Sequence, residues 1–243
     1  MSRKQAQLEL DLRTWGGKRV GAGRPQVHRR CSEPHRERED FAPRAATHVT
    51  LRLVDGLPTL RCPGAYDAIH AAMTAVRARD DFRIVHASIQ RNHLHLRNEA
   101  DGKESLGKGV QALQISAAHH LKRHLLRDRS MMHKGSVFVD RDHVEIVDTP
   151  TQTRNALAYV LLNWRKHGED RDVPWLLDPY ASALAFDGWS DAPGRWTVPD
   201  RYRPLPTRAP RNWLLREGWR RAGAIAMTEV PSQAVRGRRR GRV

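Results

Sequence analysis

Cysteine and long apolar runs are both scarce in this sequence. Its 243 residues include two cysteines, Cys31 and Cys62, which stand apart without the spacing of a metal or redox motif. A disulfide framework is therefore not indicated, and a reducing, cytoplasmic location fits best. The chain lacks the run of about 18 apolar residues that a membrane-spanning helix needs, and "MSRKQAQLELDL" has no signal-peptide core. With a mean hydropathy of -0.69, we expect neither a membrane segment nor a membrane partner.

Acidic residues are also few, and they are scarcest at the two ends of the chain. The formal net charge is +16, from 43 Lys and Arg against 27 Asp and Glu. Residues 1–38 hold ten Lys and Arg against four acids, and residues 204–243 hold ten against two, which leaves +2 for the segment between them. A near-neutral centre with two basic arms is typical of a chain that binds a polyanion through its ends. Charge kept for solubility would be spread more evenly, so nucleic acid is the expected partner.

Composition divides the chain into three parts. Residues 1–43 contain "GGKRVGAGRPQVHRR", where glycine, proline and cations leave almost nothing apolar, so we predict a disordered basic arm. Residues 44–170 alternate strand and helix periodicities and form the expected folded domain. Residues 171–243 form a Trp- and Pro-rich extension with a short helix near "RNWLLREGWRRAGAIA" and a basic tail, "VRGRRRGRV". One domain with appendages suits a chain of this length.

The central part has the periodicities of four strands and three helices. The expected strands are 47–54, 82–90, 93–100 and 135–147, the last broken near Asp140. The expected helices are 64–80, 105–128 and 150–168. Ser105 is a plausible N-cap of the second helix, while Thr149-Pro150 starts the third and Gly168 ends it. The order β-α-β-β-α-β, followed by a helix, predicts an α+β fold of the ferredoxin-like split β-α-β type, with a four-stranded antiparallel sheet and helices on one face.

Two histidines, His93 and His95, stand one residue apart in the stretch "SIQRNHLHLRNEA". Side chains alternate along a strand, so both imidazoles should point to one face of the sheet. A two-residue turn before His93 would pair it with Gln90. Two neutral imidazoles and a nearby amide oxygen can hold a single divalent cation. The same residues would equally suit the wet face of an ordinary sheet.

The helix expected at 150–168 carries a polar stripe with spacings of four, four and three residues. Its members are Asn155, Tyr159, Asn163 and Lys166. A phenol with a pKa of about 10 is a poor nucleophile in water. Beside a cation, however, it can attack a phosphodiester whose oxygens the cation polarises, which leaves a phosphotyrosine link. Tyr159 would otherwise be an ordinary buried aromatic residue with a hydrogen-bonded hydroxyl.

Five stretches of the sequence carry a family resemblance. They are "WGGKRVGAGRP", "FRIVHASIQRNHLHL", "GSVFVDRDH", "ALAYVLLNWRKHG" and "NWLLREGWRR". Together they resemble the single-tyrosine HUH transposases, and more narrowly the REP-associated tyrosine transposases, with the highest specificity at 82–100 and 135–168. The resemblance implies a metal-dependent endonuclease and strand transferase that acts on single-stranded DNA, often beside a hairpin, through a 5′-phosphotyrosine intermediate. It leaves both a monomer and a homodimer open.

The resemblance also implies roles for particular residues. It makes His93 and His95 ligands of Mg²⁺ or Mn²⁺ and makes Tyr159 the nucleophile. Asn163 falls where the family has a polar ligand on the tyrosine helix. Gln90 falls where family members often have an acidic or amide residue near the metal.

Cations that could contact DNA lie in both arms, on the second helix and after the tyrosine. They are Arg19, Arg24, Lys108, Lys122, Arg123, Arg127, Lys166, Arg238, Arg239 and Arg240. For those on the second helix, an ordinary solvated helix face is an equally simple explanation.

Arg97 and Asn98 depart from the family pattern, because relatives tend to have apolar residues at these places. This departure favours a second hypothesis, a catalytically inactive DNA- or RNA-binding protein that keeps the fold. A third hypothesis is a metal-dependent hydrolase that uses water. That chemistry would need further acidic ligands near the histidines, and Glu99 is the candidate.

Overall fold

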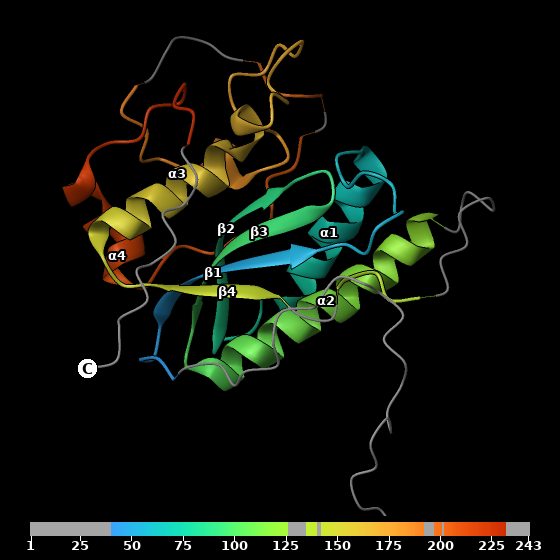
Figure 1. The fold of residues 1–243 in the computed structure, drawn as a ribbon, viewed down its shortest axis with the longest axis horizontal. Helices are drawn as coiled ribbons and strands as arrows, with labels where there is room; N and C mark the ends of the chain where they lie inside the picture. The colour runs from blue at the N-terminus through green and yellow to red at the C-terminus, as the bar shows by residue number, and fades with distance from the viewer. Residues whose placement is uncertain (1–39, 126–134, 140–141, 192–196, 201, 232–243) are drawn as a thin grey trace, which may run out of the picture. The chain divides into compact units, whose positions relative to one another are not determined.

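Four strands form a single antiparallel sheet in the computed structural model, which describes residues 40–125, 135–139, 142–191, 197–200 and 202–231 (Figure 1). The strands are β1 (Ala45–Arg52), β2 (Phe82–Ile89), β3 (His93–Ala100) and β4 (His143–Val147). Their order is β2-β3-β1-β4, with every neighbouring pair antiparallel. The first and third strands thus occupy the centre, as in a ferredoxin-like split β-α-β unit, and the predicted fold class is confirmed.

The register of the sheet is set by the β2–β3 hairpin and by the pairing of β1 with β3. Gln90 N donates to His93 O at 2.9 Å, which is the pairing predicted from the two-residue turn. Across the other edge of β3, Thr50 lies opposite His95 and Leu51 lies opposite Leu94. Because side chains alternate, His48, Thr50, His93 and His95 share one face, and Val49, Leu51, Leu94 and Leu96 share the other.

Two helices, α1 (Pro63–Val76) and α2 (Lys103–Leu125), cover the apolar face of the sheet (Figure 1). Their buried residues, including Ile69, Met73 and Leu113, pack with Leu94 and Leu96 of β3 in the main core. Each of these side chains is at most 1% exposed. Burial of a side chain of this size contributes about 1.5–3 kcal/mol, so this core accounts for much of the stability of the domain.

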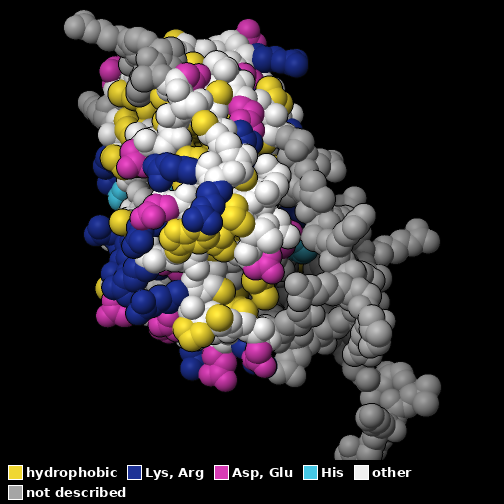
Figure 2. Space-filling view, turned by 90° about the vertical axis from the view of Figure 1, so that its left-hand side faces the viewer, with side chains coloured by type: hydrophobic (Ala, Val, Ile, Leu, Met, Phe, Trp, Pro, Cys, Tyr) yellow, Lys and Arg dark blue, Asp and Glu magenta, His cyan; other side chains and the backbone are white. Residues whose placement is uncertain are grey.

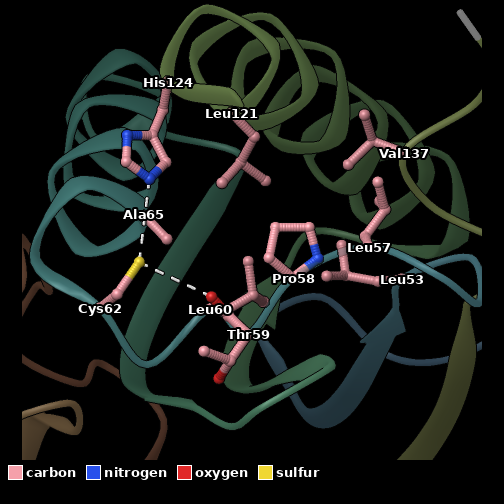
Figure 3. Close-up of a pocket in the computed structure, with 10 residues that line it drawn as sticks. All are labelled: Leu53, Leu57, Pro58, Thr59, Leu60, Cys62, Ala65, Leu121, His124 and Val137. Atoms are coloured by element: carbon pink, nitrogen blue, oxygen red, sulfur yellow. Dashed lines mark hydrogen bonds between the residues drawn. The ribbon is translucent and has the colours of Figure 1, made fainter. Parts of the chain in front are cut away.

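A cavity of about 260 Å³ remains where α1, α2 and the loop after β1 meet (Figure 3). Its lining is almost wholly apolar, apart from Thr59, Cys62 and His124. The Cys62 thiol donates to Thr59 O at 3.6 Å, and its Sγ lies 3.8 Å from His124 Nε2. With so few polar groups, the cavity offers no ligand set for a metal ion or a phosphate.

The third helix, α3 (Pro150–Lys166), lies across the opposite, polar face of the sheet (Figure 1). It starts as predicted, with the Thr149 side chain accepting from Gln152 N at 3.2 Å and Pro150 in the first turn. It ends before Gly168, whose φ of +67° suits glycine and turns the chain back on itself.

The C-terminal extension packs on the outer side of α3. Its short helices are η2 (Ser182–Ala185), α4 (Trp213–Arg216) and η3 (Gly218–Ala222). Leu215 and Trp219 form a second apolar cluster with Leu157 and Leu161 of α3. α3 is therefore enclosed between the sheet and the extension, which explains why apolar residues occur around most of its circumference.

Buried ionic contacts hold this extension in place. Arg61 donates two hydrogen bonds of 2.9 Å to the fully buried Asp178. Glu99 accepts at 2.8 Å from the backbone N–H groups of Arg211 and Asn212. Removing one partner of such a buried pair leaves a charge without compensation, which is strongly destabilising.

Most predicted elements are found within a few residues of their expected bounds, with one correction. Ser105 is not an N-cap, because α2 already begins at Lys103 after Gly102, whose φ of +124° makes the turn. In the fourth strand region Phe138 forms an isolated bridge and β4 starts at His143, while the break predicted near Asp140 lies outside the described residues. The predicted end of the second helix at 128 lies outside the described residues, and the boundaries at 43 and 170 stay predictions. No helix in the described ranges is long and apolar enough to cross a membrane.

Candidate functional site

His93 and His95 project from β3 toward α3, because Leu94 and Leu96 between and after them point into the main core. Their two Nε2 atoms lie 2.9 Å apart. The Nδ1 atom of His93 lies 2.8 Å from the side-chain oxygen Oδ1 of Asn92. An amide oxygen only accepts, so His93 Nδ1 carries the proton and Nε2 keeps its lone pair.

The ring of His95 is oriented by two residues of β1. Its Nδ1 atom lies 3.1 Å from Thr50 Oγ1 and 3.2 Å from His48 Nε2. A proton on Nδ1 donated to either acceptor leaves the Nε2 lone pair facing that of His93. Two lone pairs 2.9 Å apart repel each other unless a proton or a cation lies between them. Hydrogen bonds at the other ring nitrogen, like those of His95 Nδ1 here, usually orient histidines that bind a metal.

Tyr159 packs directly on the His95 ring from α3. Its ring centroid lies 4.9 Å from that of His95, at an interplanar angle of 75°. The ring of His48 is 5.9 Å away, and Lys166 Nζ lies 4.9 Å from the Tyr159 centroid. Burial raises the pKa of the Tyr159 hydroxyl and the neighbouring Asn163 side chain lowers it less, so the hydroxyl stays protonated at neutral pH.

Asn163 and Gln90 are the amide side chains predicted to complete a metal site. Asn163 is fully buried one turn after Tyr159, and neither of its side-chain polar atoms has a hydrogen-bond partner of regular geometry among the described residues. Gln90 is 2% exposed, and its Nε2 donates to Ser88 Oγ at 2.5 Å. A buried amide one helical turn from Tyr159, without a regular hydrogen-bond partner among the described residues, fits the role of an oxygen ligand for a divalent cation. Within the described residues, no three His, Cys, Asp or Glu side chains form a metal-binding group.

Two acids that could serve as metal ligands, Glu99 and Glu169, are each engaged in an ion pair. Glu99, the predicted candidate, is engaged with the C-terminal extension and forms an ion pair with Arg83 at 3.6 Å. Glu169 follows α3 and pairs with Arg91, and its other oxygen is 3.8 Å from Arg61 Nε. These pairings weaken the hypothesis of a water-using hydrolase, which needs acidic ligands.

Buried histidines make the folded state sensitive to acid. Burial, and then the nearby charge of Arg97, lowers the pKa of both His48 and His86 from 6.5 to about 3. Between these values the unfolded chain binds protons that the folded chain rejects. We therefore expect the free energy of unfolding to fall from pH 6.5 downward, by about 1.4 kcal/mol per pH unit for each histidine. Urea unfolding in EDTA at neutral pH and near pH 5 measures this loss, and equal values would contradict it.

Arg97 is a buried cation with no hydrogen-bond partner among the described residues. It is 0% exposed, and none of its guanidinium nitrogens has a hydrogen-bond partner in the described part of the chain. It lies between His48 on β1 and His86 on β2 in the sheet register. Burial lowers its pKa from 12.5 to about 10, although Glu145 opposes that change.

Replacing Arg97 by Met should raise the free energy of unfolding by about 1–3 kcal/mol, because an unpaired buried charge is exchanged for an apolar side chain of similar length. Urea unfolding measures the change. Arg97→Lys is the matched control, since it keeps a buried cation and should bring no gain. A less stable Arg97→Met protein would show that the guanidinium is paired in solution.

The structure separates the predicted DNA-contacting cations. Lys166 lies at the Tyr159 ring, but Lys108, Lys122 and Arg123 are on α2, which covers the opposite face of the sheet. The remaining six lie outside the described residues: Arg19, Arg24, Arg127, Arg238, Arg239 and Arg240. The α2 cations therefore do not reach the His93/His95 site from within one chain.

A basic surface that the sequence prediction did not include lies on α4 and η3. Arg221 stacks on Trp213 with its guanidinium carbon 4.8 Å from the ring centroid, and Arg220 stacks on Trp219 at 4.7 Å. Trp213 is 41% exposed. Figure 2 views the side on which α4 lies in Figure 1, and Lys and Arg side chains gather there beside exposed hydrophobic ones. Such a surface can contact a nucleic acid backbone and stack on a base.

Comparison with known proteins shows a likeness of fold. No family model and no curated protein matches the chain. A solved structure of a REP-associated tyrosine transposase bound to a REP hairpin matches with a TM-score of 0.51 and 16% identity, over 73% of this chain and 98% of that one. This chain has the fold of that transposase. A candidate transposase from Deinococcus radiodurans R1 also matches, with a TM-score of 0.36 and 12% identity over 56% of this chain and 97% of its own.

The fold of that transposase agrees with the family resemblance read from the sequence. Two residues at the site were nevertheless missed by sequence reasoning, namely His48 and Thr50. They stand one residue apart in "THVTLR", the same spacing as His93 and His95. That spacing was the available signal, but the β1–β3 register alone brings the two pairs together.

Proposed function

We propose that the protein is a metal-dependent endonuclease and strand transferase, a transposase that cleaves and rejoins single-stranded DNA. The observation that carries this proposal is the packing of Tyr159 on His95, 4.9 Å between centroids, where the Nε2 atoms of His93 and His95 converge. A nucleophile and a pair of cation ligands on one enclosed surface are the parts that phosphodiester transfer requires.

In this mechanism His93, His95 and Asn163 would hold Mg²⁺ or Mn²⁺, with Gln90 nearby. When bound, the cation would polarise the phosphate oxygens and the leaving oxygen. Tyr159 Oη forms a bond to phosphorus, the phenol proton is lost, and the bond from phosphorus to the 3′-oxygen breaks. The 3′-oxygen takes up a proton and leaves, and the 5′ strand end stays attached as a phosphotyrosine. The reverse attack by another 3′-hydroxyl would rejoin the strands.

Enclosure of the site supports this division of roles. Burial lowers the pKa of His93 from 6.5 to about 4, with smaller effects from His167 and Arg52, so its imidazole is neutral and free to act as a ligand at neutral pH. Because the pKa of Tyr159 is raised, its hydroxyl remains a weak nucleophile until a substrate and a cation arrive.

The substrate we infer is single-stranded DNA beside a hairpin. The structural neighbour with the higher TM-score is described as bound to a REP hairpin. In this chain, Lys166 at the site and the Arg220 and Arg221 surface offer positive charge for a phosphate backbone. The charge of +6 on residues 1–38 would add further contacts.

A DNA- or RNA-binding protein that has lost catalysis is the second candidate. The observation that favours it is Arg97, because an unpaired charge under α3 opposes tight closure of the helix on the sheet. Such a protein would bind hairpins but would never become covalently attached to them.

One experiment separates these two candidates. The full-length protein is incubated with labelled single-stranded hairpins from the flanks of its own gene, with Mn²⁺ or with EDTA. A Mn²⁺-dependent covalent adduct that survives denaturation is the expected result. Binding without any adduct would leave the second candidate in its place.

A further inference from the structure

A cavity of about 550 Å³ opens beside His93, outside the cluster formed by the histidines and Tyr159. Its wall contains Thr59, Gln90, Asn92, His167 and Glu169. The volume falls within the range of small-molecule sites, roughly 300–1,000 Å³. It is large enough for one nucleotide, and His93, one of the proposed metal ligands, lies in its wall.

The wall of this cavity is held by contacts between distant parts of the chain. Leu60 N donates to Arg91 O at 2.8 Å, which ties the loop after β1 to the β2–β3 turn. Glu169 bonds to Arg91 on one side and approaches Arg61 on the other. Arg61 is itself fixed by its paired hydrogen bonds to Asp178. The cavity is thus built before any ligand arrives, which lowers the entropy cost of binding.

The chemistry of the lining suits a nucleobase better than a phosphate. The charge of Glu169 offsets that of Arg91, so the lining has no net positive charge to attract an anion. The amides of Gln90 and Asn92 can donate and accept, as the edge of a base requires. The His167 ring offers a flat surface of the kind on which unpaired bases stack.

We propose that this cavity receives the unpaired nucleobase next to the scissile phosphate. This inference rests on the proposed function, and it names a specificity element of that same site. The Glu169 carboxylate is an acceptor, so the cavity selects a base with an exocyclic amino group, such as cytosine or adenine, and disfavours thymine, which has none.

The test uses the full-length Tyr159→Phe protein, so that binding is measured without cleavage. The probes are one DNA hairpin with single-stranded flanks of about eight nucleotides, made of deoxycytidine, deoxyadenosine or thymidine. We expect the thymidine flanks to bind about tenfold more weakly than the others. Adding Glu169→Gln should reduce that preference to about twofold or less, because the amide can pair with thymine as well.

Asp170→Asn is the matched control, because it makes the same change one residue along on an acid that pairs with Arg165 instead. It should keep the full tenfold preference. Equal affinity for the three probes, or a preference that survives Glu169→Gln, would overturn the proposed base site. Failure of the proposed function gives a different result: wild-type protein then forms no adduct, while the base preference persists. Absence of binding to all three hairpins would overturn both.

Discussion

Replacing Tyr159 by Phe should abolish covalent attachment to DNA while leaving affinity for the hairpin within about twofold. The substitution removes only the hydroxyl, and the ring can still pack on His95 and His48. Loss of the nucleophile should reduce adduct formation on the order of 10⁴-fold or more, since catalytic groups that act as a unit fail together. Denaturing gels with a labelled strand measure the adduct, and fluorescence anisotropy measures binding.

Tyr180 offers a matched control for this prediction. It is another partly buried tyrosine, and its ring lies under Arg61 at 4.7 Å in the C-terminal extension. Tyr180→Phe removes the same hydroxyl from a ring that packs on Tyr66 instead of His95, so adduct formation should persist. An adduct that still forms with Tyr159→Phe would exclude Tyr159 as the nucleophile. Loss of the adduct in both variants would point to a structural cause.

Replacing His95 by Ala should produce the second large effect. It removes one of the two Nε2 atoms that lie 2.9 Å apart, so Mn²⁺ affinity should fall more than about 100-fold and Mn²⁺-dependent cleavage should reach background. Isothermal titration with Mn²⁺ measures affinity independently of cleavage. His95→Ala protein that still shows Mn²⁺-stimulated adduct formation would contradict the proposed metal site.

The smaller substitution Thr50→Val tests whether ring orientation matters. It removes the hydroxyl that lies 3.1 Å from His95 Nδ1 with little change of volume. A loss of Mn²⁺ affinity of about 10–100-fold, with both histidines intact, would fit the role of a residue that orients a ligand. Thr47 is the control, because it lies on β1 but on the apolar face, with its hydroxyl donating to Asn98 O.

The fold could be predicted from local patterns for clear physical reasons. Alternating apolar residues in β1, β2 and β3, and the Thr149-Pro150 start of α3, are signals carried within a few residues. Ser105 failed as a cap because glycine at 102 accepts a positive φ and begins the helix earlier. The sequence predicted α3 as a helix with many apolar residues. It did not predict which residues pack on the outer side of α3, because Leu215 and Trp219 come from more than fifty residues away.

Local sequence patterns predicted only part of the candidate site. His93 and His95 were placed on one face by strand alternation, and Tyr159 with Asn163 on one surface by helical spacing. The α2 cations were chosen for their charge alone, and packing placed them on the other side of the sheet. Glu169 was passed over because an acid after a helix carries no signal until Arg61 and Arg91 are seen around it.

The sequence by itself determined which side chains share a face, because that property follows from the period of each strand and helix. The tertiary structure alone decided which faces meet: Thr50 and His48 beside His95, Tyr159 above it, and the cavity between Gln90 and Glu169. Those contacts depend on strand register and on packing between residues far apart in the chain. Such contacts are settled by the burial of the whole core, and no short stretch of sequence specifies them.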